Sequence, residues 1–496
     1  MKCLTLFTLS IPLLLLFNKN AFTQNKDLDN FNLEIQQIVQ HTDFKNAQFA
    51  LLAVDVNSHE VITEINADKS LKPASTLKLF STAMALENCG ADFKFTTTIA
   101  YTGIIDTIDK ILHGDIVIVG GGDPTLGSKY FPGEEGQQFL QRWVSDIQKL
   151  GIDSIDGRII ADACIYNRDM VPPTWLWQDM GNYFGAGPCG LSVYDNMYTI
   201  YFKSGATVGD TVEIVRVIPE MDDIFFDNTV IASSIHYDNA YIYGSPYTNY
   251  RYLRGEIPLN KNSFAVKGSV PDPAYLTASE FRKALEVAGI VIKKEATTIR
   301  RLKLFNEETH MGELIPIASY ASPPMSEIVK LTNIHSINLF AEHGLLQAGL
   351  SKGKPASTAE CASTMTDFWE NKGMDVQGLT LQDGSGLSPL NTLTARQMAH
   401  LLTYMKSHSN HYNHFYNSLP IAGQTGTIKS MFKGTPAEGK LRAKSGSMTG
   451  VSAYAGYTTS QSGKDIAFCL MVNNYSCSSA TVRKRLERIM VLLTGL

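Results

Sequence analysis

The sequence predicts an α+β protein in which a β-rich insertion interrupts a domain of mixed helices and strands. Three observations support this fold class. An apolar helical pattern lies near the start, at 72–86. From about residue 97 to 315, β-branched and aromatic residues alternate between Gly, Pro, Asp and Asn, which is typical of strands and turns. Helical periodicity then returns, and the chain closes with strand and helix patterns.

The first predicted helix carries a serine and a lysine on its first turn. Pro73 suits entry into a helix, and the residues after it are apolar at three-to-four-residue spacing. Ser75 and Lys78 are three residues apart, so they share one helical face. A partly desolvated lysine is driven toward its neutral, basic form. The pair therefore has the composition of a nucleophile and its base.

The long middle stretch differs in composition from both flanks. Its strand-like segments are 94–103, 113–127, 211–219 and 239–246. Helical patterns return at 326–349 and 357–373. The end of the chain predicts two antiparallel strands over 453–474 and a packed helix over 478–496.

The N-terminus predicts a secretory signal peptide over 1–24. Lys2 precedes about fifteen mostly apolar residues and then a polar stretch, which is too short for a membrane span. The mature protein is expected to start near Gln24 or Asn25. Because no other uninterrupted apolar stretch reaches eighteen residues, we expect an exported protein with no membrane span in its mature part, located in the periplasm or otherwise outside the cytoplasm.

Composition excludes several classes of function. The chain has 496 residues, of which 44% are hydrophobic and 18% charged, and this indicates a globular protein of two or three domains. A formal net charge of −5 without a long Lys/Arg run argues against nucleic-acid binding. The histidines at 408, 411 and 414 are interpreted as a solvated loop rather than a metal site, and no cofactor is expected. Six cysteines outside the signal cannot be paired from sequence.

Two further motifs carry residue types that would complement Ser75 and Lys78 in a catalytic site. Ser336 and Asn338 form a Ser-x-Asn where a loop turns into an apolar helix, and Lys444, Ser445 and Gly446 lie near an alternating apolar strand. In order, the three motifs follow the S-x-x-K, S-D-N and K-T-G signature of penicillin-binding proteins and class A β-lactamases. A second Ser-x-x-Lys at 351–354 reads as a solvated loop, and a second Lys-Ser-Gly at 203–205 as a strand-ending turn.

The chain resembles the class C low-molecular-mass penicillin-binding proteins, the D-alanyl-D-alanine carboxypeptidases and endopeptidases. Beyond the motifs, the resemblance lies in the segments 120–126, 191–196, 383–391 and 432–457. It implies a β-lactamase/transpeptidase-like catalytic domain, an antiparallel sheet flanked by helices, split into 25–97 and 316–496 by extra domains at 98–315. The departures are Ile337 where the family often has Asp, and Ser445, which keeps the hydroxyl of the usual Thr.

The resemblance also implies roles for individual residues. Ser75 is the expected nucleophile, Lys78 its base and Ser336 a proton relay. The implied substrate-binding residues are Asn338, Lys444, Ser445 and Gly446. The backbone N–H groups of Ser75 and Ser447 form the expected oxyanion hole.

The expected substrates are peptidoglycan stem peptides and their cross-links, with β-lactams as covalent inhibitors. Two alternatives stay open. A β-lactamase needs an additional positioned base for fast deacylation, and no motif supplies one. A non-catalytic wall-binding protein with the same fold would have eroded motifs, whereas all three are present here.

Overall fold

The computed structural model describes residues 29–132, 138–307 and 312–496, so the predicted signal peptide lies outside the described residues. The chain divides into two compact units. The first unit comprises the described residues up to Leu71, with Thr394–Ser407 and Pro420–Leu496; the second comprises Lys72–Leu393 and His408–Leu419. The predicted domain boundaries, 25–97 and 316–496 around an insertion at 98–315, follow the change in composition and stay a prediction.

The first unit is built on a five-stranded antiparallel sheet in the order β19-β20-β21-β1-β2. Its strands are β1 (Gln48–Asp55), β2 (Val61–Ile65), β19 (Arg442–Met448), β20 (Val451–Thr459) and β21 (Asp465–Asn473). The two antiparallel strands predicted near the end of the chain are confirmed as β20 and β21. On the side away from β20, β19 pairs in the described part of the chain only at its start, where Arg442 bridges Ile421, so the Lys-Ser-Gly motif lies on a sheet edge.

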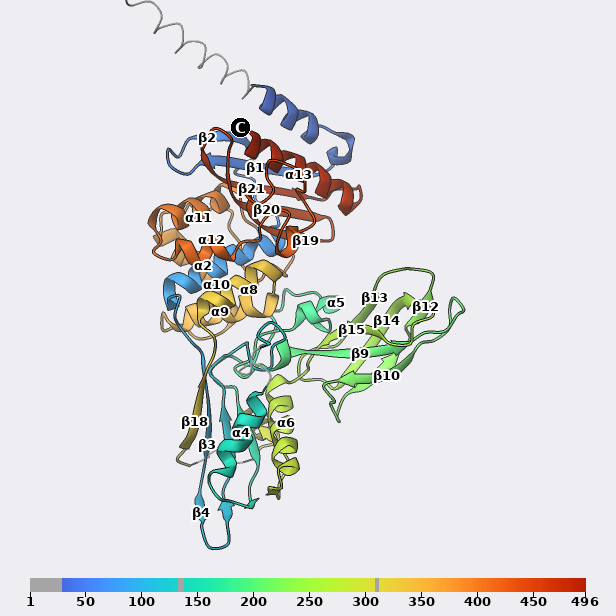
Figure 1. Ribbon diagram of the computed structural model, residues 1–496, viewed down its shortest axis with the longest axis vertical. Coiled ribbons are helices and arrows are strands. Elements are labelled where there is room, and N and C mark those ends of the chain that lie inside the picture. The colour runs from blue at the N-terminus through green and yellow to red at the C-terminus, as the bar shows by residue number, and fades with distance from the viewer. Residues whose placement is uncertain (1–28, 133–137, 308–311) are drawn as a thin grey trace, which may run out of the picture. The chain divides into compact units, whose positions relative to one another are not determined.

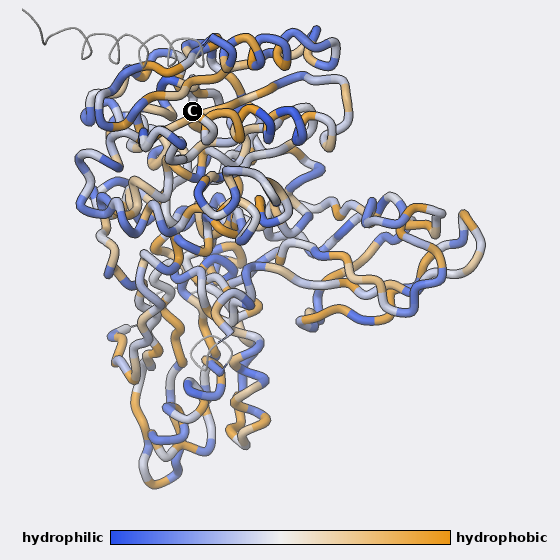
Figure 2. The backbone as a smooth tube through the Cα atoms, turned by 45° about the horizontal axis from the view of Figure 1, so that its top comes forward, coloured by the Kyte–Doolittle hydropathy of each residue, from blue (hydrophilic) through white to orange (hydrophobic). Residues whose placement is uncertain are grey.

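Helices cover both faces of this sheet. The helical residues 29–39 and α13 (Ser479–Gly495) pack on one face through an apolar cluster that includes Ile35, Phe468 and Leu486 (Figure 1). Tyr457 points to the opposite face, where its hydroxyl donates to the carbonyl of Leu402 in α11 (Ala395–His408) at 2.7 Å. Hydrophobic and hydrophilic residues alternate along these helices, as amphipathic packing requires (Figure 2). The short 3₁₀ turns of this unit are η1 (Thr42–Phe44) and η5 (Gly426–Ile428).

Helices from the first and last parts of the second unit pack together as one layer. Its elements are η2 (Ala74–Leu77), α2 (Lys78–Cys89), α8 (Met325–His335), α9 (Asn338–Leu350), α10 (Thr358–Asn371) and α12 (Tyr412–Ser418). The α2 helix is central: Phe80 packs edge-on against Trp369 of α10, and the α8 residue Asn333 donates to the Thr82 hydroxyl at 3.2 Å. The helices predicted at 326–349 and 357–373 are confirmed.

Next to this layer, the second unit contains two small mixed sheets and three helices that were not predicted from the sequence. One sheet has the order β17-β8-β6-β3-β18 and the other β16-β7-β5-β4. Their strands are β3 (Thr96–Tyr101), β4 (Ile104–Asp106), β5 (Ile111–His113), β6 (Ile116–Val119), β7 (Ser154–Ile155), β8 (Ile159–Asp162), β16 (Val291–Ile292), β17 (Thr297–Thr298) and β18 (Ile315–Ala321). The missed helices are α4 (Phe139–Gln148), α6 (Pro273–Val287) and α7 (Ile299–Leu304). Asp272 caps α6 and Pro273 opens it, a signal that the sequence carried.

Two further sheets pack face to face in the second unit. One has the order β10-β9-β15, and in the other β14 pairs with β11, β12 and β13. Their strands are β9 (Met197–Lys203), β10 (Glu213–Ile218), β11 (Phe225–Asn228), β12 (Ile231–Ser233), β13 (Asn239–Tyr243), β14 (Tyr250–Pro258) and β15 (Phe264–Ser269). The turns α5 (Trp177–Met180), η3 (Tyr183–Gly185) and η4 (Tyr194–Asn196) precede them. Among the described residues, no helix is long and apolar enough to cross a membrane.

Candidate active site

Ser75 and Lys78 lie in contact at the entry to α2. Ser75 belongs to the 3₁₀ turn η2, and Lys78 is the first residue of the α-helix that follows. In a 3₁₀ turn, side chains three residues apart lie directly above one another. Lys78 Nζ is 2.9 Å from Ser75 Oγ. The contact predicted from the spacing is therefore confirmed.

Lys78 is fully buried among oxygen acceptors. Its Nζ donates to Asn338 Oδ1 at 2.6 Å and to the backbone carbonyl of Ser385 at 2.7 Å. A neutral amine has two N–H groups and one lone pair. With both N–H groups directed at these carbonyls, the lone pair is left for the hydroxyl of Ser75.

Burial also favours the neutral form of this amine. It lowers the pKa of Lys78 to about 7, although the carboxyl groups of Asp383 and Glu342 act in the opposite direction. Near pH 7 a large fraction of the amine is therefore unprotonated. The arrangement places a serine hydroxyl next to an amine whose pKa lies near neutrality.

Two buried carboxyl groups hold the loop that supplies the Ser385 carbonyl. Glu342, on α9, accepts from the backbone N–H groups of Gly384 and Ser385 at 2.9 and 2.8 Å. Burial and the charge of Asp383 raise the pKa of Glu342. Asp383 accepts four hydrogen bonds, from Trp175 Nε1, Gly386 N, Ser388 N and Asn391 Nδ2. These contacts fix the loop, and with it one of the two acceptors of Lys78.

Asn338 connects Lys78 to a third segment. It is the first residue of α9, and its Nδ2 donates to the carbonyl of Phe184 at 2.7 Å. Ser336 lies two residues earlier, at the C-cap of α8, in a left-handed conformation with φ of 59°. The structure thus brings Asn338 to the Ser75 and Lys78 pair, whereas the role of Ser336 stays a prediction.

His343, on α9, lies within hydrogen-bond distance of two of the segments that carry the family resemblance. Its Nδ1 lies 2.8 Å from the carbonyl of Gly122, and its Nε2 lies 3.0 Å from Ser192 Oγ. Burial lowers the pKa of His343 to about 3, so the ring is neutral. The segments at 120–126 and 191–196 therefore brace the helix that carries Asn338 and Glu342.

The Lys-Ser-Gly motif lies on the edge strand β19 of the first unit. Lys444 is buried and its Nζ donates to the carbonyl of Ser445 at 2.7 Å; the Ser445 hydroxyl donates to Thr427 Oγ1 at 2.7 Å. Gly446 pairs with Ala453 of β20, and the exposed Ser447 pairs with Ser452. An edge strand can accept an extended peptide through main-chain hydrogen bonds.

The alternative motif matches lie in the places expected for them, with one correction. Residues 351–354 form an exposed turn, and Lys203 ends β9. The histidines do not form a loop: His408 ends α11 and His414 lies within α12, because the apolar residues around them continue two helices. Within the part of the chain that the structure describes, no group of three or more His, Cys, Asp or Glu side chains is placed to hold a metal, and the six cysteines are unpaired.

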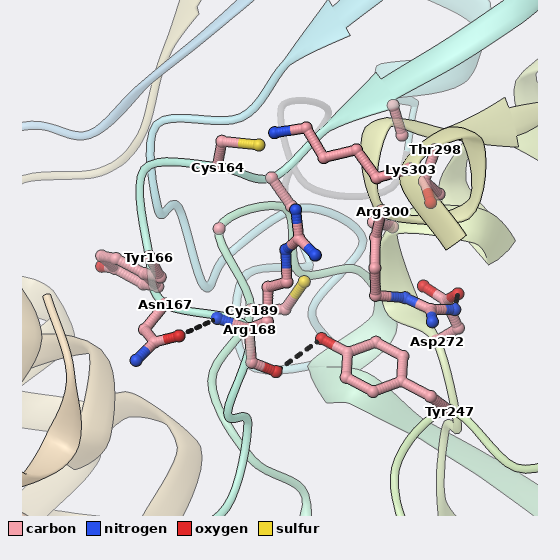
Figure 3. A pocket seen from close by; sticks show the side chains of 14 residues that line it. Cys164, Tyr166, Asn167, Arg168, Cys189, Tyr247, Asp272, Thr298, Arg300 and Lys303 are labelled. Atoms are coloured by element: carbon pink, nitrogen blue, oxygen red, sulfur yellow. Dashed lines mark hydrogen bonds and ion pairs between the residues drawn. The ribbon is translucent and has the colours of Figure 1, made fainter. Parts of the chain in front are cut away.

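A separate cavity of about 310 Å³ lies in the second unit (Figure 3). Arg168, Lys303 and the thiols of Cys164 and Cys189 line it. Its wall is held by an ion pair of Arg300 with Asp272 at 2.8 Å and by a hydrogen bond from the Tyr247 hydroxyl to the Arg168 carbonyl at 3.0 Å. None of the residues described as lining it belongs to the three motifs.

Comparisons with known proteins show the family to which the chain belongs. A model of the D-Ala-D-Ala carboxypeptidase 3 (S13) family matches residues 31–495. The D-alanyl-D-alanine carboxypeptidase of Actinomadura sp. (strain R39) is 26% identical over 454 residues, which cover 89% of this chain and 81% of that protein. The D-alanyl-D-alanine carboxypeptidase DacB of Haemophilus influenzae is 23% identical over 449 residues, which cover 90% of this chain and 89% of that protein.

Solved structures extend the likeness to the fold. The crystal structure of penicillin binding protein 4 (dacB) from Haemophilus influenzae superposes with a TM-score of 0.77 at 22% identity and covers 92% of this chain and 97% of that chain. A second crystal structure of that protein contains a β-lactam and has a TM-score of 0.73. The predicted α+β, transpeptidase-like fold class is confirmed.

Proposed function

Because the chain belongs to the D-Ala-D-Ala carboxypeptidase 3 (S13) family and is a D-Ala-D-Ala carboxypeptidase, we propose that Ser75 is its nucleophile and Lys78 its general base. The observation that carries this assignment is the set of three contacts of the buried Lys78 amine, to Ser75, Asn338 and Ser385. Two of these occupy its N–H groups and leave the lone pair facing the Ser75 hydroxyl.

The proposed reaction is acyl transfer. Ser75 Oγ attacks the carbonyl carbon between the two terminal D-alanines while Lys78 takes the hydroxyl proton. The C–N bond then breaks, a proton passes to the leaving amine through Ser336, and D-alanine departs. Water attacks the resulting ester, with Lys78 again removing the proton, and releases the shortened peptide.

The remaining motif residues are assigned to substrate binding. Lys444 and Ser445 bind the terminal carboxylate of the peptide, a charge-assisted contact that a lysine and a hydroxyl can supply. Asn338 holds a peptide amide, and Gly446 permits close approach of the substrate backbone on β19. The backbone N–H groups of Ser75 and Ser447 stabilise the oxyanion, each worth about 3 kcal/mol in comparable enzymes.

The proposed substrates are peptidoglycan stem peptides and also their cross-links, so that the enzyme acts as carboxypeptidase and endopeptidase. A β-lactam acylates Ser75 and stays attached, because its opened ring does not depart as a leaving amine does. The β-lactam complex of the Haemophilus influenzae protein supports this part of the proposal. A β-lactamase would instead release the opened drug rapidly, and a non-catalytic wall-binding protein would form no adduct.

One experiment separates these alternatives. The purified protein is incubated with a disaccharide pentapeptide, with its cross-linked dimer and with penicillin. Free D-alanine from the first, monomer from the second and a lasting penicillin adduct are expected. Fast release of hydrolysed penicillin without D-alanine would favour the β-lactamase, and inertness toward all three would favour the binding protein.

We also propose that the protein is exported and acts in the periplasm or otherwise outside the cytoplasm, and that a catalytic domain of residues 25–97 and 316–496 is interrupted at 98–315. The apolar N-terminal segment supports export. N-terminal sequencing of the protein from an exporting host tests it: a start near Gln24 or Asn25 is expected, and an intact Met1 would contradict it.

A further inference from the structure

The outer face of the β11, β14 and β13 strands carries a row of aromatic rings. Phe225 on β11 and Tyr250 on β14 are paired in register and stacked, with ring centroids 5.4 Å apart. Tyr252 lies two residues further along β14, so its side chain is on the same face, opposite Tyr243 of β13. β13 and β14 lie side by side in Figure 1, and β11 pairs with β14.

These rings do not take part in the core of the sheet pair. The inner face of the same strands buries residues such as Leu253 and Ile242 against the facing sheet. On the outer face Phe225 is 55% exposed, Tyr250 65% and Tyr252 42%. Several large aromatic side chains left in water on one face of a sheet are typical of a binding surface rather than of packing.

The row continues onto the segment that contacts the active site. Trp177 of α5 is 48% exposed, and its ring lies 6.1 Å from that of Tyr243. Tyr183, six residues later, is also exposed, and its ring packs edge-on against Phe184. The Phe184 carbonyl accepts from Asn338 Nδ2. We call Phe225, Tyr250, Tyr252, Tyr243, Trp177 and Tyr183 the aromatic track.

The segment with Trp177 and Tyr183 is fixed to the edge of the sheet. Asn182 Oδ1 accepts from the backbone N–H of Ile242 at 3.1 Å, and its Nδ2 donates to the Ile242 carbonyl at 3.3 Å. The Gly181 carbonyl accepts from Ser269 N at 2.9 Å. A Cβ at Gly181 would lie 2.1 Å from the Ile242 carbonyl, so this close approach requires glycine. These hydrogen bonds fix the segment that carries Trp177 and Tyr183 to β13, and Phe184 in the same segment accepts from Asn338.

The arginine on the sheet part of the track is neutralised by a carboxylate. Arg254, next to Tyr252, pairs with Asp227 of β11 at 2.7 Å and stacks over the Tyr252 ring. The face thus offers planar rings, phenolic hydroxyls, one neutralised ion pair and the carboxylate of Glu256, which accepts from Asn239 Nδ2 at 3.2 Å. Aromatic faces stack well on the C–H faces of pyranose sugars, while hydroxyl and charged groups bind sugar hydroxyls and acetamides.

We propose that the aromatic track binds the glycan strand to which the stem peptides of the wall are attached, a chain of uncharged N-acetylated pyranose rings. This inference rests on the proposed function, because it takes the peptide at Ser75 to be one end of a polymeric substrate. A glycan chain bound to the track lies along the sheet, and the stem peptide attached to it reaches Asn338. A polyanionic partner does not fit this surface, because Arg254 is already paired with Asp227 and Glu256 adds a further carboxylate.

Binding to peptide-free glycan tests the proposal independently of catalysis. The full-length chain carrying Ser75→Ala is titrated calorimetrically with soluble oligomers of N-acetylglucosamine, which are uncharged and carry no peptide. The variant Phe225→Ser/Tyr250→Ser/Tyr252→Ser in this background is expected to bind at least fivefold more weakly. The matched control Phe305→Ser removes an equally exposed ring outside the track and is expected to bind within twofold of the unaltered surface.

Turnover supplies the second measurement, in protein with Ser75 intact. The triple variant is expected to raise KM for glycan-linked pentapeptide at least fivefold, with kcat and the rate of penicillin acylation within twofold of the parent. Absence of glycan binding, or equal binding by the triple variant, would overturn the proposal. So would a dimer of the parent chain that the triple variant disperses in sedimentation, because a second copy would then occupy the track. Failure of the parent to release D-alanine from free pentapeptide would instead overturn the proposed function. The calorimetric measurement of glycan binding would still test the role of the aromatic track in that case.

Discussion

Lys78 Nζ lies 2.9 Å from Ser75 Oγ, and the amine is directed there by the carbonyl oxygens of Asn338 and Ser385. The two carbonyls come from residues 260 and 307 positions away in the chain. Each has its own support: Asn338 is anchored to Phe184, and Ser385 is anchored through Glu342. The base is thus oriented by the fold and not only by its spacing from the nucleophile.

The first prediction concerns pH. Below its pKa the Lys78 amine is an ammonium group and cannot accept the Ser75 proton; above it the base is available. Because burial lowers the pKa of Lys78 to about 7, the rate constant for acylation by penicillin is expected to rise as the pH passes through about 7 and then to level off. Stopped-flow acylation between pH 5.5 and 9 measures this. A rate that stays flat to pH 9 would contradict it.

The second prediction is a displaced pH profile in Asn338→Asp. The new carboxylate lies beside the Lys78 amine and favours its charged form, so the midpoint of the acylation profile is expected to move at least one unit above that of the parent. The loss of the donor to Phe184 lowers the plateau rate as well. The matched control Asn371→Asp, on the exposed end of α10, should leave the midpoint unchanged. An unshifted midpoint in Asn338→Asp would argue against Lys78 as the titrating base.

The third prediction is a loss of stability on removing the Asp383 carboxyl group. Asp383→Ala leaves four donors without their acceptor, and each unsatisfied buried donor costs about 1–3 kcal/mol. The free energy of unfolding is expected to fall by at least about 3 kcal/mol in urea titrations. Asp383→Asn retains one oxygen acceptor, so its free energy of unfolding should lie between those of the parent and of Asp383→Ala. The exposed Asp367→Ala serves as control and should change it by less than about 0.5 kcal/mol. Equal stability of Asp383→Ala and Asp367→Ala would be inconsistent with this description of the loop.

The fourth prediction separates the hydroxyl of Ser445 from its volume. Ser445→Thr keeps the hydroxyl and is expected to retain KM for a D-Ala-D-Ala peptide within about threefold. Ser445→Val has nearly the shape of the threonine variant but no hydroxyl. Loss of a hydrogen bond to a charged group, about 1.5–3 kcal/mol, should raise its KM by tenfold or more. Similar KM values for the two variants would show that the Ser445 hydroxyl does not bind the substrate carboxylate.

Local sequence patterns predicted the parts of the site that depend on near neighbours. The Ser75 and Lys78 contact follows from three-residue spacing, and the strands β20 and β21 follow from alternation. The supports of Lys78 left no such pattern. Glu342 lies in a helix that is buried on every side, so periodicity could not distinguish it from an ordinary buried position.

The inserted region was predicted less well for a related reason. The region is rich in strand-forming and turn-forming residues, so its sequence indicates mainly β structure. The helices α4 and α6 within it were therefore not predicted. The aromatic track was also hidden in the sequence. Tyr250 and Tyr252 read as ordinary strand residues, and only the pairing with Phe225 and Tyr243 places four rings on one face.

The assignment of Ser75 as nucleophile is tested most directly by locating the penicillin adduct. Intact and peptide mass spectrometry after penicillin treatment is expected to find one adduct, on the peptide that contains Ser75. Ser75→Ala should lose both this adduct and the release of D-alanine, while Lys78→Ala keeps the nucleophile and is acylated about a hundredfold or more slowly. An adduct on any other residue, or D-alanine release that survives Ser75→Ala, would contradict the mechanism.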